Sequence, residues 1–279
     1  MITRACISIN NKCNLNCLYC HFHEKSDVIK EENMDILKIL INIINYIDKY
    51  KIEEFKLGFV GNGEPLLNFK DLTRYITILS IYIEKGIIKP YTITNGLLLD
   101  EDKMNFMINN KVNIGISLDG PKWIQDKYRC NSFDKTIEKI QLYNSLFSEY
   151  PSLNATVGKE TIENAEEVIT FFERFKSRIT FSRMIGNYGI SLNEFHEFLE
   201  KAKEKLNVRT GGYDCTMYGG MCGVGLDNIF YMNGKIWRCG NCINLTPICD
   251  SNTPLDEIKM EVEEFDRHFC YKEMKGENI

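Results

Sequence analysis

Three cysteines stand close together near the start of the chain, at Cys13, Cys17 and Cys20. A closed structural zinc site needs four protein ligands, so zinc would require a further ligand such as His21 or His23. Iron–sulfur clusters are also held by cysteine thiolates, and a four-iron cluster with three cysteines keeps one iron open. An open iron can bind a substrate or a cofactor. We therefore expect a 4Fe–4S cluster with an outside ligand at this loop.

Before residue 206 the chain alternates short β-like runs with amphipathic helical patterns. Six strand-then-helix units predict a parallel sheet with right-handed crossovers, and hence an α/β open sheet or barrel. A glycine-rich stretch then ends the alternation, which predicts two domains, 1–206 and 207–279. The predicted strands are 4–9, 54–60, 90–94, 112–118, 153–157 and 178–184.

The segments between the strands show helical patterns. Ser191 and Glu194 form a capping-box pattern, which predicts a helix that runs to about Leu206. Two other segments have apolar residues at helical spacing, which predicts one buried face in each. These faces are Leu37, Leu40, Ile41, Ile44 and Ile47 in the first, and Ala165, Val168, Ile169 and Phe172 in the second.

Polar motifs follow the predicted strands at the point where each strand ends. The cysteine loop follows the first strand, and "GNGEP" (61–65), "TNG" (94–96) and "SLDGP" (117–121) follow the next three. Taken singly, each of these three motifs could be only a turn or a strand exit. Ligands of parallel α/β folds bind at the carboxyl ends of the strands. We therefore expect the four loops to form one site.

Together these motifs resemble the radical S-adenosylmethionine (SAM) superfamily over most of the chain. The cysteine motif matches, with Tyr19 before its last cysteine, and "GNGEP" is similar to a "GGEP" motif that holds the amino group of SAM. Asn62 replaces the first glycine of that motif. The stretch 117–129 resembles members with a C-terminal auxiliary-cluster domain, called SPASM or, when short, twitch. The resemblance implies a partial (β/α)6 TIM-like barrel followed by a small cysteine-rich domain.

The resemblance also implies site residues and a reaction. Ser117 would contact the ribose of SAM and Arg129 its carboxylate, roles that suit a hydroxyl and a guanidinium. The reduced cluster would cleave SAM to methionine and a 5′-deoxyadenosyl radical, which takes a hydrogen atom from a substrate in the barrel. The other residues expected at the cofactor are Tyr19, Phe22, Asn62, Gly63 and Glu64.

A second group of cysteines lies in the tail. "NIFYMNGKIWRC" predicts a β-hairpin with Asn233 and Gly234 as its turn, and a helix is expected at about 254–268. The spacing from Cys222 through Gly234 to Cys239 resembles the auxiliary-domain motif, which implies a twitch domain with one auxiliary 4Fe–4S cluster. A zinc ribbon is the alternative. The implied ligands are Cys215, Cys222, Cys239 and Cys242, with Cys249 as a rival for the fourth position.

Three cysteines stand outside both groups: Cys6, Cys130 and Cys270. We expect them to be buried apolar residues, with a hydrogen-atom donor as the alternative role for one of them. The clustering of the other cysteines favours a reducing compartment, and the first residues lack the apolar core of a signal peptide. Both observations predict a cytoplasmic protein.

The net charge of −5 argues against nucleic acid or an anionic membrane as a partner, although a local basic groove stays possible. No apolar run approaches the ~20 residues that a membrane-spanning helix needs. Electron transfer would come from a flavodoxin or ferredoxin. Only twelve residues precede Cys13, so a precursor peptide would be held by the barrel and tail alone or by a second protein.

The family resemblance implies an enzyme that modifies a ribosomally made precursor peptide by crosslinking, epimerisation or excision. Alternatives are a small-molecule dehydrogenase, a maturase of a residue in another protein, an iron–sulfur electron carrier and a zinc-stabilised binding module. Sulfatase-maturing members place an aspartate base directly after the cysteine that matches Cys239. Gly240 occupies that position here, so we expect no aldehyde formation on a sulfatase-type peptide.

Overall fold

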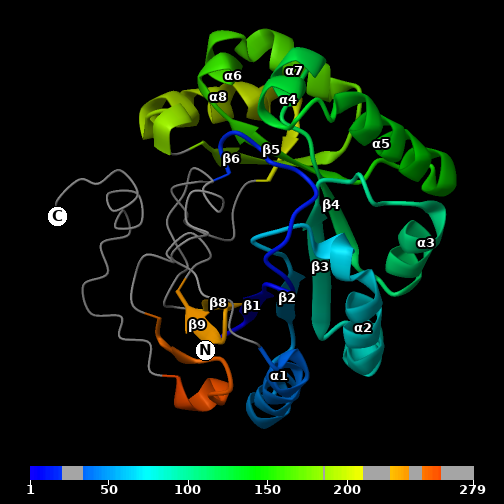
Figure 1. Cartoon of the computed structure of the whole chain (residues 1–279), viewed down its shortest axis with the longest axis vertical. Coiled ribbons are helices and arrows are strands. Elements are labelled where there is room, and N and C mark those ends of the chain that lie inside the picture. Colours follow the sequence, from blue (N-terminus) through cyan, green and yellow to red (C-terminus); the bar gives the residue numbers. More distant parts are fainter. Residues whose placement is uncertain (21–33, 185, 210–226, 239–246, 259–279) are drawn as a thin grey trace.

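The computed structural model describes residues 1–20, 34–184, 186–209, 227–238 and 247–258 (Figure 1). Its strands form one ten-stranded sheet in the order β10-β9-β8-β1-β2-β3-β4-β5-β6-β7. All neighbours from β1 to β7 are parallel. The strands are β1 (Arg4–Ile7), β2 (Phe55–Phe59), β3 (Ile88–Thr94), β4 (Asn113–Ser117), β5 (Ser152–Val157), β6 (Arg178–Arg183), β7 (Asn207–Val208), β8 (Asn228–Met232), β9 (Lys235–Trp237) and β10 (Cys249–Asp250).

Helices follow the parallel strands and lie along the outer side of the curved sheet (Figure 1). Together with the sheet they form the predicted partial barrel, and each of the six predicted strands is confirmed. The helices are α1 (Ile36–Tyr50), α2 (Phe69–Glu84), α3 (Glu101–Asn109), α4 (Lys122–Tyr128), α5 (Phe133–Phe147), α6 (Lys159–Glu163), α7 (Ala165–Glu173) and α8 (Leu192–Lys205). Short 3-10 helices are η2 (Pro65–Asn68), η3 (Gly186–Tyr188) and η5 (Leu255–Glu257).

The two faces of the sheet differ, as alternation along a strand requires. In β1, Ala5 and Ile7 are fully buried in the main apolar core, whereas Arg4 and Cys6 are only partly buried. The same core contains the buried residues of the helices, so it lies between the helices and the sheet. The opposite, inner face is therefore the one available for a substrate.

Tyr91 crosses this inner face from β3 to β1. Cys6, Gly58 and Tyr91 lie in register on three neighbouring strands. The Tyr91 hydroxyl lies 3.1 Å from Cys6 Sγ and accepts a hydrogen bond from Arg4 Nη2 at 2.9 Å. A Cβ atom at Gly58 would stand 2.5 Å from the Tyr91 ring. Only glycine at position 58 leaves room for this crossing.

The predicted apolar face of α1 is partly wrong. Ile41, which the spacing placed on that face, is 54% exposed, while Ile36, Ile39 and Ile43 are buried. Isoleucine and leucine occur all around this helix, so periodicity alone did not select the buried side. The face predicted for α7 is confirmed, since Val168, Ile169 and Phe172 are buried there. That helix carries glutamates on its other side, which made its pattern unambiguous.

The capping box predicted for α8 is confirmed. Ser191 Oγ accepts a hydrogen bond from the Glu194 backbone N–H at 3.2 Å, and the Glu194 carboxylate accepts one from the Ser191 N–H at 2.8 Å. Both bonds satisfy N–H groups that a helix terminus otherwise leaves unpaired. The helix ends at Lys205, one residue before the predicted end.

The predicted hairpin is confirmed as β8 and β9. Asn233 and Gly234 both have positive φ, 50° and 72°, which is the backbone of the two-residue turn that matches strand twist. β8 also pairs in parallel with β1, so the hairpin extends the barrel sheet. Of the helix expected at about 254–268, the described residues contain only the short 3-10 helix η5, which ends at Glu257 because Ile258 has extended backbone. Residues 259–268 lie outside the described residues. The division at residue 206 stays a prediction.

No helix in the described part of the chain is long and apolar enough to cross a membrane.

Candidate functional site

The three-cysteine loop leaves the carboxyl end of β1. Cys13 is exposed, and Cys17 and Cys20 are partly buried. The pKa of Cys17 is raised to about 12, chiefly by burial; Arg129 opposes the rise, and Asp119, Cys20 and Cys13 add to it. With their pKa values raised, Cys13 and Cys17 are neutral thiols when no metal is bound, and metal binding releases their protons.

These thiols do not form a single-ion site. Among the described residues, no group of three or more His, Cys, Asp or Glu side chains is placed to hold one metal ion. Cysteines of a four-iron cluster bind different irons and need not converge on one point. Three neighbouring thiols on one loop match the number of cysteines that hold a four-iron cluster with one open iron. His21 and His23, the zinc alternative, lie outside the described residues.

The loop after β2 supports the base of the cysteine loop. The Glu64 N–H donates to the Lys12 carbonyl at 2.7 Å, and the Asn10 side chain donates to the Glu64 carbonyl at 2.9 Å. A Cβ atom at Gly63 would overlap the Lys12 carbonyl oxygen. Gly63 therefore lets the loop after β2 approach the Lys12 carbonyl closely, and this contact fixes the start of the cysteine loop.

The Glu64 carboxylate is buried and joins two loops. It accepts hydrogen bonds from the Thr94 hydroxyl at 2.6 Å, the Asn95 N–H at 2.8 Å and the Leu66 N–H at 3.1 Å. Burial raises the pKa of Glu64, and these hydrogen bonds oppose that rise. The Asn95 amide continues the network to Asn14 in the cysteine loop at 2.7 Å. Asn95 is thus more than a turn residue.

Asp119, at the end of β4, is the centre of a second network. Its Oδ2 accepts from Tyr19 Oη at 2.6 Å and from Arg129 Nε at 2.8 Å, and its Oδ1 accepts from the Thr156 N–H at 2.9 Å. Its own N–H donates to the Gln125 side chain at 2.8 Å. Sequence reasoning treated Asp119 as a turn former and missed this role. The signal in the sequence that could have indicated this pair is an acidic residue ten positions before Arg129.

Arg129 stands beside the cysteine loop. Its guanidinium lies 5.5 Å from the centre of the Tyr19 ring and is close enough to Cys17 to lower the pKa of that thiol. Within the described residues, only its Nε makes a hydrogen bond. Asp119 therefore fixes the guanidinium plane and keeps the remaining N–H groups available for a carboxylate.

The remaining predicted residues are distributed around this region. Ser117 is the buried last residue of β4, in register with Asn154 of β5. The Asn62 side chain contacts the sulfur of Met232 in β8, so this loop also touches the hairpin. Five predicted residues lie outside the described residues: Phe22, Cys215, Cys222, Cys239 and Cys242.

A profile of the Radical SAM superfamily matches residues 7–172, which is more than half of the chain. The chain belongs to the radical SAM superfamily. As a member it uses a 4Fe–4S cluster and SAM, and the residues described above fit both. When bound, this pair supplies a 5′-deoxyadenosyl radical. Contacts of Gly63 and Glu64 position the cysteine loop, and Asp119 orients Arg129.

Several known proteins are similar to this radical SAM enzyme. The cysteine-type anaerobic sulfatase-maturating enzyme of Clostridium novyi is 30% identical over 211 residues, covering 69% of this chain and 56% of that protein. The serine-type enzyme of Bacteroides thetaiotaomicron is 29% identical over 172 residues, covering 59% and 41%. The chain spans about half the length of these curated relatives.

A solved structure has the same fold. Native anSMEcpe with bound AdoMet matches with a TM-score of 0.72 and 19% identity, covering 99% of this chain and 84% of the other. At this identity the likeness concerns the fold alone. It agrees with the partial barrel found here.

Two of the cysteines expected to be buried apolar residues are described. Cys130 is exposed, so that expectation is wrong for it. It has a positive φ of 55° and its thiol donates to the Asn16 carbonyl at 3.1 Å, because the chain turns sharply after α4. Cys6 is partly buried and contacts Tyr91. Cys270 lies outside the described residues.

Replacing Gly63 by alanine is expected to lower iron loading severalfold, because the new methyl group would push the Lys12 carbonyl and the cysteine loop away. Gly61→Ala is the matched control, since its nearest contact would be 3.1 Å from the Gly63 backbone nitrogen. Iron content after anaerobic reconstitution measures the effect. Equal iron in the two variants would contradict the role of Gly63.

Proposed function

We propose that this radical SAM enzyme modifies a ribosomally made peptide, by taking a hydrogen atom from one of its residues. The products we consider are a crosslink, an epimerised residue or an excised backbone segment. The observation that carries the proposal is the 30% identity over 211 residues to an anaerobic sulfatase-maturating enzyme. That relative matures a sulfatase, which is itself a polypeptide substrate.

In this proposal Cys13, Cys17 and Cys20 hold the cluster, Arg129 pairs with the carboxylate of SAM, and Ser117 contacts its ribose. The Asp119–Arg129 hydrogen bond supports the role of Arg129, because an oriented guanidinium can bind a carboxylate through two parallel bonds. The other residues proposed to surround the cofactor are Tyr19, Phe22, Asn62, Gly63 and Glu64. Gly63 is the residue whose lack of a side chain allows close contact with the Lys12 carbonyl.

We further propose that 207–279 binds one auxiliary 4Fe–4S cluster through Cys215, Cys222, Cys239 and Cys242. Strands β8 and β9 support this, since their hairpin joins the segments that carry Cys222 and Cys239. Cys249, in β10, pairs with Ile236 of β9 and so lies beside the same hairpin. It stays the rival for the fourth position.

The setting of the reaction is also part of the proposal. A cytoplasmic flavodoxin or ferredoxin supplies the electron, and a separate protein can present the leader of the precursor peptide. A reducing compartment keeps the cluster thiols available for iron.

Anaerobically reconstituted protein with dithionite and SAM tests the enzymatic step. It should release 5′-deoxyadenosine, and a short peptide encoded beside the gene should increase that release and change in mass. Intact clusters without any 5′-deoxyadenosine would refute radical chemistry. Release without any peptide change, across all neighbouring short reading frames, would refute the peptide substrate.

We expect no aldehyde product from a sulfatase-type cysteine or serine peptide. Removing two electrons from such a side chain needs a base near the thiol or hydroxyl, and Gly240 offers none. Asp250 is the next acid along the chain; a hydrogen bond from the Asn252 N–H lowers its pKa, and its carboxylate is exposed. It is therefore a weak base that faces solvent.

Mass spectrometry of the peptide after anaerobic turnover measures this prediction. A sulfatase-maturating enzyme from Clostridium perfringens serves as the positive control in the same buffer. Aldehyde formation by both proteins would show that another residue acts as the base.

A further inference from the structure

The barrel has a cavity of about 270 Å³ at the end opposite the cysteine loop. Its lining residues come from the first positions of the strands, such as Asn113 of β4 and Ser152 of β5, and continue along the inner face to Tyr91 and Ile93. Five of the lining residues are cations and none is an acid: Arg4, Lys56, Lys89, Arg178 and Arg209.

These five cations are engaged to different degrees. Arg4 donates to the Tyr91 hydroxyl, and Lys56 forms a half-exposed ion pair with Glu54 at 3.5 Å, outside the lining. Arg4 and Arg209 also have other partners. Within the described residues, the side chains of Lys89 and Arg178 make neither an ion pair nor a hydrogen bond. The inference therefore depends on these two.

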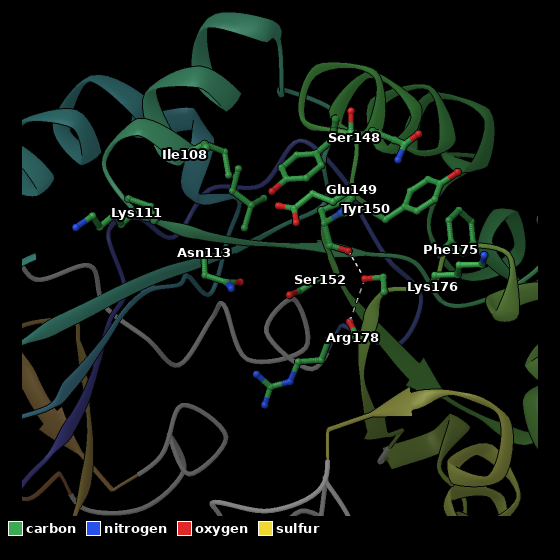
Figure 2. Close-up of a pocket in the computed structure, with 16 residues that line it drawn as sticks. Ile108, Lys111, Asn113, Ser148, Glu149, Tyr150, Ser152, Phe175, Lys176 and Arg178 are labelled. Carbon is green, nitrogen blue, oxygen red and sulfur yellow. Dashed lines mark hydrogen bonds between the residues drawn. The ribbon is translucent and has the colours of Figure 1, made fainter. Parts of the chain in front are cut away.

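The basic character continues into an adjoining pocket of about 670 Å³ (Figure 2). Arg178 lines both, and Figure 2 shows its side chain pointing away from Tyr150 and Phe175. This second pocket adds Lys111 and Lys176, against Glu149 as the one acid in its lining. Like charges gathered around a cavity repel one another, and the cavity walls focus their field. A bound anion removes that repulsion.

The acidic groups that the structure describes near the cavity do not neutralise it. Asp227 lies close enough to Arg4 and Lys56 for both to lower its pKa, although burial raises that pKa overall. Glu54 is paired with Lys56 at the surface. Neither acid lines the cavity, so the Lys89 and Arg178 side of it keeps its positive charge.

We propose that this cavity binds an acidic residue of the peptide substrate, through its carboxylate, at Lys89 and Arg178. The inference rests on the proposed peptide substrate and adds its chemical class. An inorganic phosphate would fill a small part of 270 Å³, whereas an acidic side chain with its backbone fills more of it. A chain with net charge −5 also has little reason to gather cations at one place unless an anion binds there.

The length of β3 also predicts how many peptide residues separate the acidic residue from the modified one. Strand β3 runs from Lys89, which lines the cavity, to Thr94, whose hydroxyl donates to Glu64 in the loop after β2. At ~3.3 Å per residue this is about 17 Å, which an extended peptide also covers with about five residues. The acidic residue therefore lies about five positions from the residue that is modified.

Binding is measured with the cluster-loaded full chain under anaerobic conditions. The probe is a fluorescent peptide of alternating glutamate and glycine, with a glutamine–glycine peptide as the neutral analogue. The test variant is Lys89→Gln with Arg178→Gln. The charge-matched control is Lys70→Gln with Lys201→Gln, on the exposed sides of α2 and α8.

We expect the test variant to bind the acidic peptide at least about tenfold more weakly than the control, since hydrogen bonds to charged groups are being lost. The neutral peptide should bind poorly to all proteins. Equal affinity in test and control variants would overturn the proposal. So would phosphate or a single-stranded oligonucleotide that binds at these two residues while the acidic peptide does not.

The same proteins are assayed for 5′-deoxyadenosine with SAM alone. Normal release together with lost peptide binding in the test variant assigns the defect to the cavity. Absent release in the wild type would instead refute the proposed function, and leaves the binding result to be judged separately.

Discussion

Replacing Cys13, Cys17 and Cys20 together by alanine is expected to abolish SAM cleavage and to remove about half of the bound iron. Two 4Fe–4S clusters would give about eight irons per chain, and in the proposed assignment each of these cysteines would supply one bond to the first cluster. Their thiols are close enough to influence one another, so the triple replacement removes all the proposed ligands of one cluster. Iron analysis and chromatography of 5′-deoxyadenosine measure the two effects.

Cys130→Ser is the matched control for the triple variant. Cys130 lies against the same loop through Asn16 and is exposed, but it is outside the cysteine motif. Serine keeps a donor for that carbonyl, so iron content and SAM cleavage should stay normal. A triple variant that still produced 5′-deoxyadenosine would overturn the assignment of the cluster. A triple variant that kept all its iron would do the same.

Replacing Arg129 by alanine is expected to weaken SAM binding by ~1.5–3 kcal/mol, or roughly 10- to 100-fold, while iron content stays unchanged. The change also leaves the fully buried Asp119 carboxylate without its cation. Removing one partner of a buried pair typically costs about 3–5 kcal/mol of folding free energy. Binding and stability therefore fall together in this variant.

Adding Asp119→Asn separates the two effects. The amide removes the unpaired buried charge, so the double variant should regain part of the lost stability. It should not regain SAM affinity, because the guanidinium is still absent. Calorimetry for SAM and denaturant unfolding measure the two quantities. Full SAM affinity in the single variant would mean that another residue binds the carboxylate.

The strands of the barrel could be predicted because each one is a local run of β-branched and aromatic residues between turn residues. The Asn233–Gly234 turn was equally local, since the backbone of that turn favours those two residues. The order of motifs after the strands then located the site. Each of these signals depends on neighbours in sequence.

What could not be predicted depends on contacts between distant segments. Asp119 has the sequence surroundings of an ordinary turn residue. Its role comes from the hydrogen bonds that it accepts from Tyr19 and Arg129, which lie next to it only in the folded chain. The placement of β8 beside β1 follows from the open edge of the sheet and from no local pattern. The cations of the inner cavity are likewise scattered over several strands, and the overall negative charge conceals them.

The pairing of β1 with β8 has a consequence for how the protein is made. Arg4 leaves the ribosome long before its partner Asn228, because 223 residues lie between them in the sequence. At typical translation rates, β1 waits roughly ten seconds or longer between pairing with β2 and pairing with β8. Its free edge is open to other chains throughout that time. Iron delivered to the adjacent cysteines before β8 emerges would bind an unfinished sheet, so cluster insertion belongs after translation.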